Sequence, residues 1–180
     1  MPLRSRYALI GVLVALLAGV FLWKYADTTG GVDKTDESIK LGWKKVDSPL
    51  PEDDLPGLSG VAAGLPREGT YLLNLWYSTC GPCRHEMPWL ERLHDEGGVD
   101  VIGVTRDTIE KSAVEAAAEF GVTYPNYWDR LAEFWFSLSD LVPPQVAPHS
   151  LIVVDGQVTW VHIGPFKSYA ELHDEVTERL

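Results

Sequence analysis

YLLNLWYSTCGPCRHEMPWLERL, residues 71–93, contains both cysteines of the chain, Cys80 and Cys83, separated by two residues. The apolar run before them, residues 71–76, predicts a buried strand, and the amphipathic run after them predicts a helix. Cys80 is thereby placed at a helix N-terminus, where unpaired backbone N–H groups and the helix dipole favour an anion. A thiolate, the form of cysteine that attacks a disulfide, is stabilised there. The Gly-Pro dipeptide between the cysteines makes the turn tight, and proline suits the first helical turn.

Other uses of this cysteine pair fit the sequence less well. Zinc takes four ligands, and the chain offers two cysteines and five scattered histidines without ligand spacing. Covalent haem attachment needs histidine directly after the second cysteine, where this chain has Arg84. A structural disulfide across two residues would restrain the unfolded chain little. The pair therefore predicts thiol–disulfide exchange, with no metal and no cofactor beyond the redox-active disulfide between Cys80 and Cys83.

Around the cysteines the chain resembles the thioredoxin superfamily, in which CGPC is the active-site motif. Trp76 lies four residues before Cys80, and Pro88 falls where that family kinks the active-site helix. Thioredoxin carries a buried aspartate six residues before the first cysteine, but this chain has Asn74. Asparagine there, with Glu86 in the pattern CxxCxxExP, is similar to the membrane-anchored TlpA/ResA-type branch. The resemblance implies a thioredoxin-like α/β fold, a central mixed sheet flanked by helices.

The remaining segments supply elements for an α/β domain with parallel pairing, because strands and helices alternate after the cysteines. Glycine, proline and Asp-Gly mark their ends, and Asp155-Gly156 predicts the turn of a hairpin. The run 124–138 is expected to be an inserted excursion whose aromatic residues Phe134, Trp135 and Phe136 pack against a core. The other predicted elements are a short strand at 43–46, a strand at 99–105, a helix at 110–120, hairpin strands at 150–154 and 158–163, and a final helix at 167–180.

Pro148, just before the first hairpin strand, matches the loop that carries a cis proline opposite the cysteines in thioredoxin-like folds. The resemblance implies a cis Ala147–Pro148 bond and free Ala147 backbone groups that pair with an extended substrate. An ordinary trans proline opening a strand is the alternative. His149 lies either near the thiols, where it would tune them, or on the surface. The substrate-contacting residues expected from the resemblance are Trp76, Gly81, Pro82, Ala147 and Pro148.

The N-terminus carries a targeting segment. Residues 7–23 hold no charge and no proline, close to the minimum of about 17–25 residues that span a bilayer. Bulky residues follow, so the small-x-small site of a cleaved signal peptide is missing from this stretch. We interpret the segment as an uncleaved anchor, with a cleaved signal as the alternative. The expected organisation is a single transmembrane anchor at 1–24, a flexible linker at 25–42 and a thioredoxin-like domain at 43–180.

Charge indicates both orientation and partners. Arg4 and Arg6 precede the apolar run, so the N-terminus is expected in the cytoplasm and the domain outside it. Residues 1–23 hold those two arginines and no acid, which leaves a net charge of −13 on the rest of a chain whose total is −11. Such an acidic surface argues against nucleic acid as a partner. It complements a basic protein partner, or it keeps the domain soluble.

The predicted chemistry assigns a role to each thiol. Cys80 attacks a partner disulfide, and Cys83 then attacks Cys80 to release the reduced partner. Glu86, one helical turn beyond Cys83, either accepts the Cys83 proton or is a surface glutamate in an ion pair. The resemblance implies a reductant of exported protein disulfides, notably apocytochrome c, supplied by a membrane electron donor. A disulfide-forming oxidase or isomerase is one alternative, which CGPC disfavours. A non-catalytic docking module is another, which the intact cysteines disfavour.

Overall fold

The computed structural model describes residues 39–180. The predicted anchor, residues 1–24, and most of the predicted linker, residues 25–42, lie outside this part of the chain. Within residues 39–180, no helix has the length and apolar character needed to cross a bilayer.

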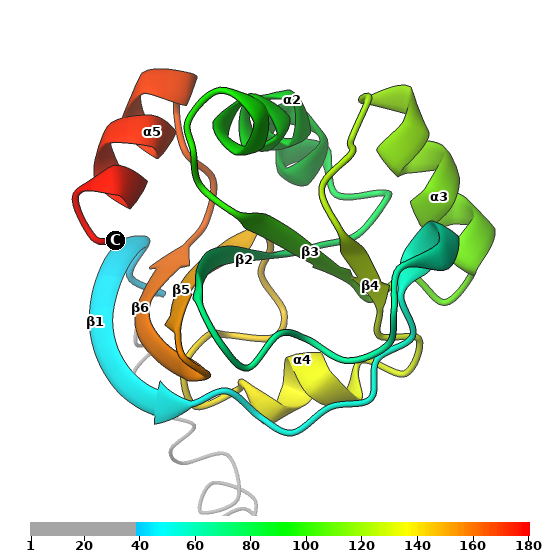
Figure 1. Cartoon of the computed structure of the whole chain (residues 1–180), viewed down its shortest axis with the longest axis horizontal. Coiled ribbons are helices and arrows are strands. Elements are labelled where there is room, and N and C mark those ends of the chain that lie inside the picture. Colours follow the sequence, from blue (N-terminus) through cyan, green and yellow to red (C-terminus); the bar gives the residue numbers. More distant parts are fainter. Residues whose placement is uncertain (1–38) are drawn as a thin grey trace, which may run out of the picture. The chain divides into compact units, whose positions relative to one another are not determined.

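The described residues form one mixed sheet with the strand order β1-β6-β5-β2-β3-β4 (Figure 1). β2 pairs in parallel with β3 and antiparallel with β5, so the expected mixed thioredoxin-like sheet is confirmed. The strands are β1 (Gly42–Pro49), β2 (Thr70–Trp76), β3 (Val101–Thr105), β4 (Asn126–Trp128), β5 (His149–Val154) and β6 (Gln157–Ile163).

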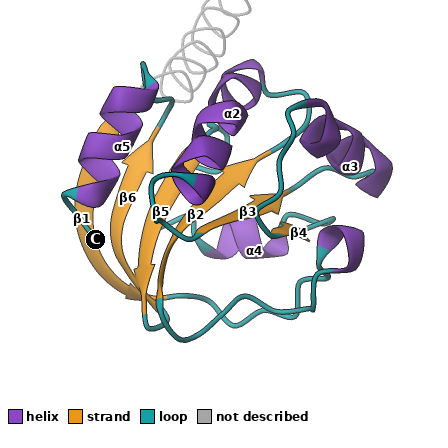
Figure 2. Cartoon of the chain, turned by 45° about the horizontal axis from the view of Figure 1, so that its top comes forward, coloured by secondary structure: helices purple, strands orange, loops and turns teal. Residues whose placement is uncertain are grey.

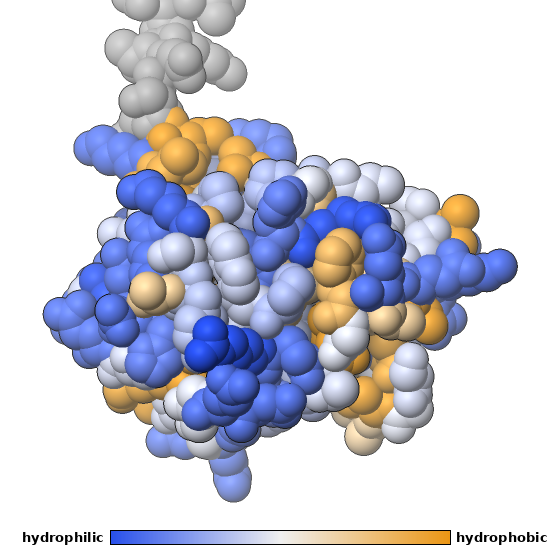
Figure 3. Space-filling view, turned by 90° about the horizontal axis from the view of Figure 1, so that it is seen from above, coloured by the Kyte–Doolittle hydropathy of each residue, from blue (hydrophilic) through white to orange (hydrophobic). Residues whose placement is uncertain are grey.

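Helices cover both faces of the sheet. Three of them, α2 (Gly81–Asp95), α3 (Glu110–Glu119) and α5 (Tyr169–Thr177), lie on one face, and α4 (Glu133–Ser137) lies on the other (Figures 1 and 2). A 3-10 turn, η1 (Leu58–Gly60), precedes β2. The face that carries α2, α3 and α5 is mostly hydrophilic, with several apolar patches (Figure 3).

β2 is buried on both faces, which explains why its sequence is apolar without alternation. Leu72 packs with residues of α2 and α5, whereas Leu73 and Leu75 pack on the opposite face with Trp135 of α4. Each of these leucines has no exposed surface. Full burial of one leucine side chain stabilises the fold by about 2 kcal/mol.

Two details differ from the sequence-based predictions. The stretch 124–138 is more than an excursion, because residues 126–128 form β4, an edge strand parallel to β3. Phe134 and Trp135 are buried as predicted, but Phe136 is 56% exposed, so its predicted core packing is wrong. α4 is only five residues long and places successive aromatic residues on different sides, so it buries two of the three.

The register of the sheet brings two distant segments to one edge. Leu75 near the end of β2 is paired with His149 at the start of β5. Pro148 therefore lies at the edge where β2 ends and the chain turns toward Cys80. The carboxyl end of β3 reaches the same edge, because Thr105 is paired with Trp76.

Candidate active site

A disulfide joins Cys80 and Cys83 at the start of α2, with their Cα atoms 5.3 Å apart. Cys80 is the N-cap of the helix, and its Sγ accepts a hydrogen bond from the Cys83 N–H at 3.2 Å. A thiolate at Cys80 would accept the same bond and lie at the positive end of the helix dipole. The exposed fractions are 4% for Cys80 and 2% for Cys83, so both cysteines are nearly covered in the disulfide form.

The dipeptide between the cysteines lies on the surface beside a groove. Gly81 and Pro82 are both exposed, and Pro82 lies in the first helical turn as predicted. A Cβ atom added at Gly81 would meet no atom within 4 Å. A groove of about 300 Å³ opens beside it; its lining residues are Gly81, Arg84, His85, Pro88 and Phe120. A partner chain can therefore approach the start of α2 beside the Gly-Pro dipeptide.

Trp76 lies beneath the site. Its side chain has no exposed surface, and its Nε1–H donates to Asn126 Oδ1 at 2.9 Å. This burial does not fit the expected contact with substrate, because a partner cannot touch a fully covered side chain. Trp76 instead supports the turn that carries Cys80 from below.

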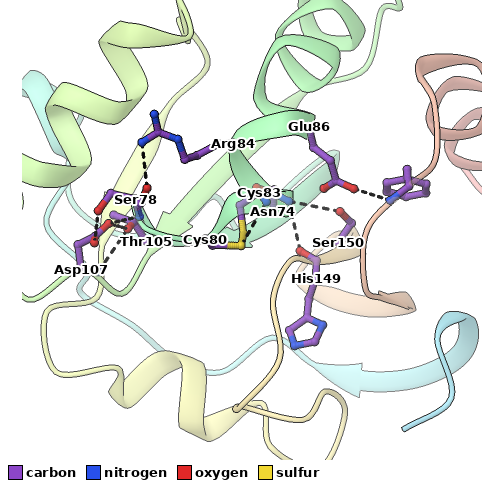
Figure 4. Close-up of a disulfide and its surroundings, with 11 residues drawn as sticks. Asn74, Ser78, Cys80, Cys83, Arg84, Glu86, Thr105, Asp107, His149 and Ser150 are labelled. Carbon is purple, nitrogen blue, oxygen red and sulfur yellow. Dashed lines mark hydrogen bonds between the residues drawn. A yellow bond between two sulfur atoms is a disulfide. The ribbon is translucent and has the colours of Figure 1, made fainter.

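The turn before Cys80 is held through Ser78. The Asp107 carboxylate accepts hydrogen bonds from the Ser78 N–H at 2.8 Å and the Ser78 hydroxyl at 2.6 Å. The same carboxylate accepts the Thr105 hydroxyl at 2.7 Å, and the Ser78 carbonyl accepts from Arg84 at 3.3 Å (Figure 4). Ser78 is thus bonded through its N–H, its hydroxyl and its carbonyl. Two residues further on, Cys80 is fixed against the carboxyl end of β3.

Glu86 is buried, with 1% of its surface exposed, one turn after Cys83 on α2. One carboxyl oxygen accepts the backbone N–H of Phe166, in the loop between β6 and α5 (Figure 4). The other oxygen has no hydrogen-bond partner among the described residues. Burial raises the pKa of Glu86 from 4.5 to about 8, against the lowering effect of the Phe166 hydrogen bond. The alternative of a surface glutamate in an ion pair is therefore wrong.

The Ala147–Pro148 peptide bond is cis, as predicted. Ala147 packs against the buried cluster that contains Trp76 and both cysteines, so the loop lies beside the disulfide. The backbone N–H and carbonyl of Ala147 take part in no backbone hydrogen bond within residues 39–180. They remain free to pair with an extended partner chain.

His149 is fully buried, so its expected surface alternative is wrong. Its Nε2 is hydrogen-bonded to the Pro143 carbonyl at 3.0 Å, and its ring points away from the disulfide (Figure 4). Burial lowers the pKa of His149 to about 4, which keeps the ring neutral near pH 7. A neutral ring that donates from Nε2 supports the loop rather than the sulfur atoms.

Sequence reasoning singled out neither Ser78 nor Asp107, nor the hydrogen bond from Arg84 to the Ser78 carbonyl. One signal was available: Arg106 and Asp107 follow the parallel strand β3 directly. The carboxyl ends of adjacent parallel strands meet at one edge of the sheet, where ligand and catalytic sites of α/β folds gather. Across the described residues, no group of three histidine, cysteine or acidic side chains is placed to hold a metal ion.

The sheet, the N-capping Cys80 and the adjacent cis proline define a thioredoxin-like thiol–disulfide oxidoreductase. The chain belongs to the Redoxin family, whose model matches residues 45–176. It is 30% identical to the thioredoxin-like protein YneN of Bacillus subtilis, over 68% of this chain and 71% of that protein. It is 28% identical to the thiol-disulfide oxidoreductase ResA of Halalkalibacterium halodurans, over 62% of this chain and 63% of ResA.

A solved structure confirms the fold. The secreted Mycobacterium tuberculosis disulfide oxidoreductase homologous to Escherichia coli DsbE superposes with a TM-score of 0.57 at 18% identity. The match covers 72% of this chain and 96% of that one. The superposition therefore spans most of the described domain.

Proposed function

We propose that this chain is a membrane-anchored, extracytoplasmic reductant of protein disulfides, with oxidised apocytochrome c as its substrate. The observation that carries the proposal is the buried Glu86, with its raised pKa, one turn after the resolving cysteine of a CGPC pair. The other residues follow from this assignment: Cys80 is the nucleophile, Cys83 resolves the intermediate, and the Ala147–Pro148 loop holds the substrate chain.

The reaction begins with both cysteines reduced. The Cys80 thiolate attacks one sulfur of the partner disulfide; a mixed disulfide forms and the partner's other sulfur leaves as a thiolate. Cys83 then loses its proton and attacks Cys80 Sγ, which releases the second partner thiolate. Two electrons have moved to the partner, and the Cys80–Cys83 disulfide is the oxidised product.

The carboxylate form of Glu86, which is the minority form near pH 7, is suited to take the Cys83 proton. Its pKa of about 8 lies close to the ordinary thiol value of about 8.5, so the transfer between them is nearly balanced in free energy. An ordinary surface glutamate, with a pKa of about 4.3, would be a much weaker base for a thiol. Asn74, buried in β2, has no proton to exchange and leaves this role to Glu86.

The CGPC dipeptide supports the direction of transfer. Thioredoxin has a potential near −270 mV, whereas the oxidant DsbA lies near −120 mV. A reducing pair outside the cytoplasm needs a continuous supply of electrons. An anchor at residues 1–24 would hold the domain beside a membrane donor. Haem attachment requires both cysteines of apocytochrome c to be reduced, which gives such a reductant a client.

Deletion of the chain, combined with a measured potential, tests the proposal. We expect the deletion to lower mature c-type cytochromes, and an added small thiol to restore them. The purified chain should have a potential near −270 mV. Normal cytochrome levels together with a potential near −120 mV would overturn the proposal in favour of a disulfide-forming oxidase.

A further inference from the structure

The loop that leads to the cis proline, residues 143–148, forms few backbone hydrogen bonds. Pro143 and Pro144 lack an N–H, so their backbone can form hydrogen bonds only through the carbonyl groups. Within residues 39–180, the backbone bonds of the loop are Val146 N–H to the Pro143 carbonyl at 3.1 Å and Gly164 N–H to the Pro148 carbonyl at 3.0 Å. The position of residues 143–147 must therefore be fixed by side chains from elsewhere.

Two side chains form hydrogen bonds with the carbonyl groups of these consecutive prolines. Arg106, directly after β3, donates from Nη1 to the Pro144 carbonyl at 2.6 Å. The His149 ring is bonded through Nε2 to the Pro143 carbonyl at 3.0 Å. A charged donor makes the stronger of these bonds, because hydrogen bonds from ionised groups are about twice as strong as neutral ones.

Aromatic rings hold the Arg106 guanidinium in place. Its Cζ lies 4.4 Å from the centre of the Trp135 ring and 4.8 Å from the centre of the Tyr77 ring. Trp135 is fully buried in α4, and its ring centre is 6.1 Å from that of His149. Tyr77 belongs to the turn before Cys80, so Arg106 links that turn, α4 and the proline loop.

We propose that Arg106 is a positioning residue, which with Trp135 and His149 holds the Pro143–Pro148 loop ready to bind the backbone of a protein substrate. This inference rests on the proposed function, in which Ala147 pairs with the substrate chain. Arg106 contacts neither sulfur atom. It therefore acts on exchange with a polypeptide and leaves the reduction of a small disulfide unchanged.

The test compares two oxidants with the full-length, pre-reduced chain in detergent. Insulin supplies disulfides within a polypeptide, and bis(2-hydroxyethyl) disulfide has no backbone to bind. Arg106→Lys keeps the charge but loses the planar fork that stacks on both rings. We expect its rate constant with insulin to fall about tenfold, as for one charged hydrogen bond. Its rate with the small disulfide should stay within about twofold, and its potential should not change.

Matched variants separate positioning from general damage. His149→Gln retains an N–H donor for Pro143 and should keep most of the insulin rate, whereas His149→Leu should lose it as Arg106→Lys does. Arg130→Lys, at an exposed position, should leave both rates unchanged. Equal losses with both oxidants, or no loss with either, would overturn the role of Arg106. If the unaltered chain reduces neither oxidant, the proposed function itself fails.

Discussion

The raised pKa of Glu86 predicts an unusual dependence of stability on pH. In the unfolded chain Glu86 ionises near pH 4.5, but in the folded disulfide form it stays protonated up to about pH 8. Between these values the folded state binds more protons than the unfolded state, so the free energy of unfolding falls as pH rises. The stability is fully present below pH 4.5 and declines up to about pH 8.

The size of the effect follows from the same two values. One proton difference changes the free energy of unfolding by about 1.4 kcal/mol per pH unit. Integrated from pH 4.5, the loss reaches about 3 kcal/mol at pH 7. Glu86→Gln removes the titration while its amide oxygen can still accept the Phe166 N–H. We therefore expect the variant to be more stable than the wild type at pH 7, and the difference to vanish near pH 4.5.

Urea unfolding of the oxidised chain, followed by tryptophan fluorescence from pH 4.5 to 8.5, measures the difference. Other groups titrate in this range: His149, whose pKa burial lowers to about 4, costs stability as pH falls below about 6.5. Subtracting the Glu86→Gln profile from the wild-type profile removes such contributions. Glu115→Gln, at an exposed position of α3, should match the wild type. Parallel profiles for wild type and Glu86→Gln would refute a buried neutral Glu86.

Two further predictions concern the turn and the thiols. In the reduced chain at pH 7, Cys80 should alkylate faster than Cys83, because its N-cap position stabilises a thiolate. The Cys83→Ser variant should trap a mixed disulfide with its partner, and the Cys80→Ser variant should trap little. Faster alkylation of Cys83 would exchange the two roles. Asp107→Asn should lower the free energy of unfolding by about 1–3 kcal/mol, because an amide cannot accept all the hydrogen bonds from Ser78 and Thr105; urea unfolding checks this, and an unchanged midpoint would show that the turn does not depend on the carboxylate.

Much of the fold is visible in the sequence because its signals are local. The apolar run before Cys80, the proline in the first helical turn and the Asp-Gly turn each act within a few residues. β4 is different, since three residues beside a proline carry no usable period. Its pairing depends on Gly103 of β3, where an added Cβ would lie 1.9 Å from Asn126 Oδ1. That oxygen also accepts the Trp76 Nε1–H. The formation of β4 therefore depends on contacts with both β2 and β3, which are distant in the sequence.

The candidate site divides in the same way. The positions of Cys80, Cys83 and Pro148 follow from motif and order, whereas the state of Glu86 depends on a partner 80 residues away, the Phe166 N–H. A glutamate on an amphipathic helix is exposed by default, but here Glu86 is buried and bonded to the β6–α5 loop. His149 follows the same rule, because α4 and the proline loop decide its burial. In this domain the cysteines are placed by local sequence, whereas the groups that we propose to adjust their proton transfer and their access to substrate are placed by tertiary contacts. Variants at Glu86 and His149 should therefore change the rates of thiol–disulfide exchange and their pH profiles, while the Cys80–Cys83 disulfide still forms.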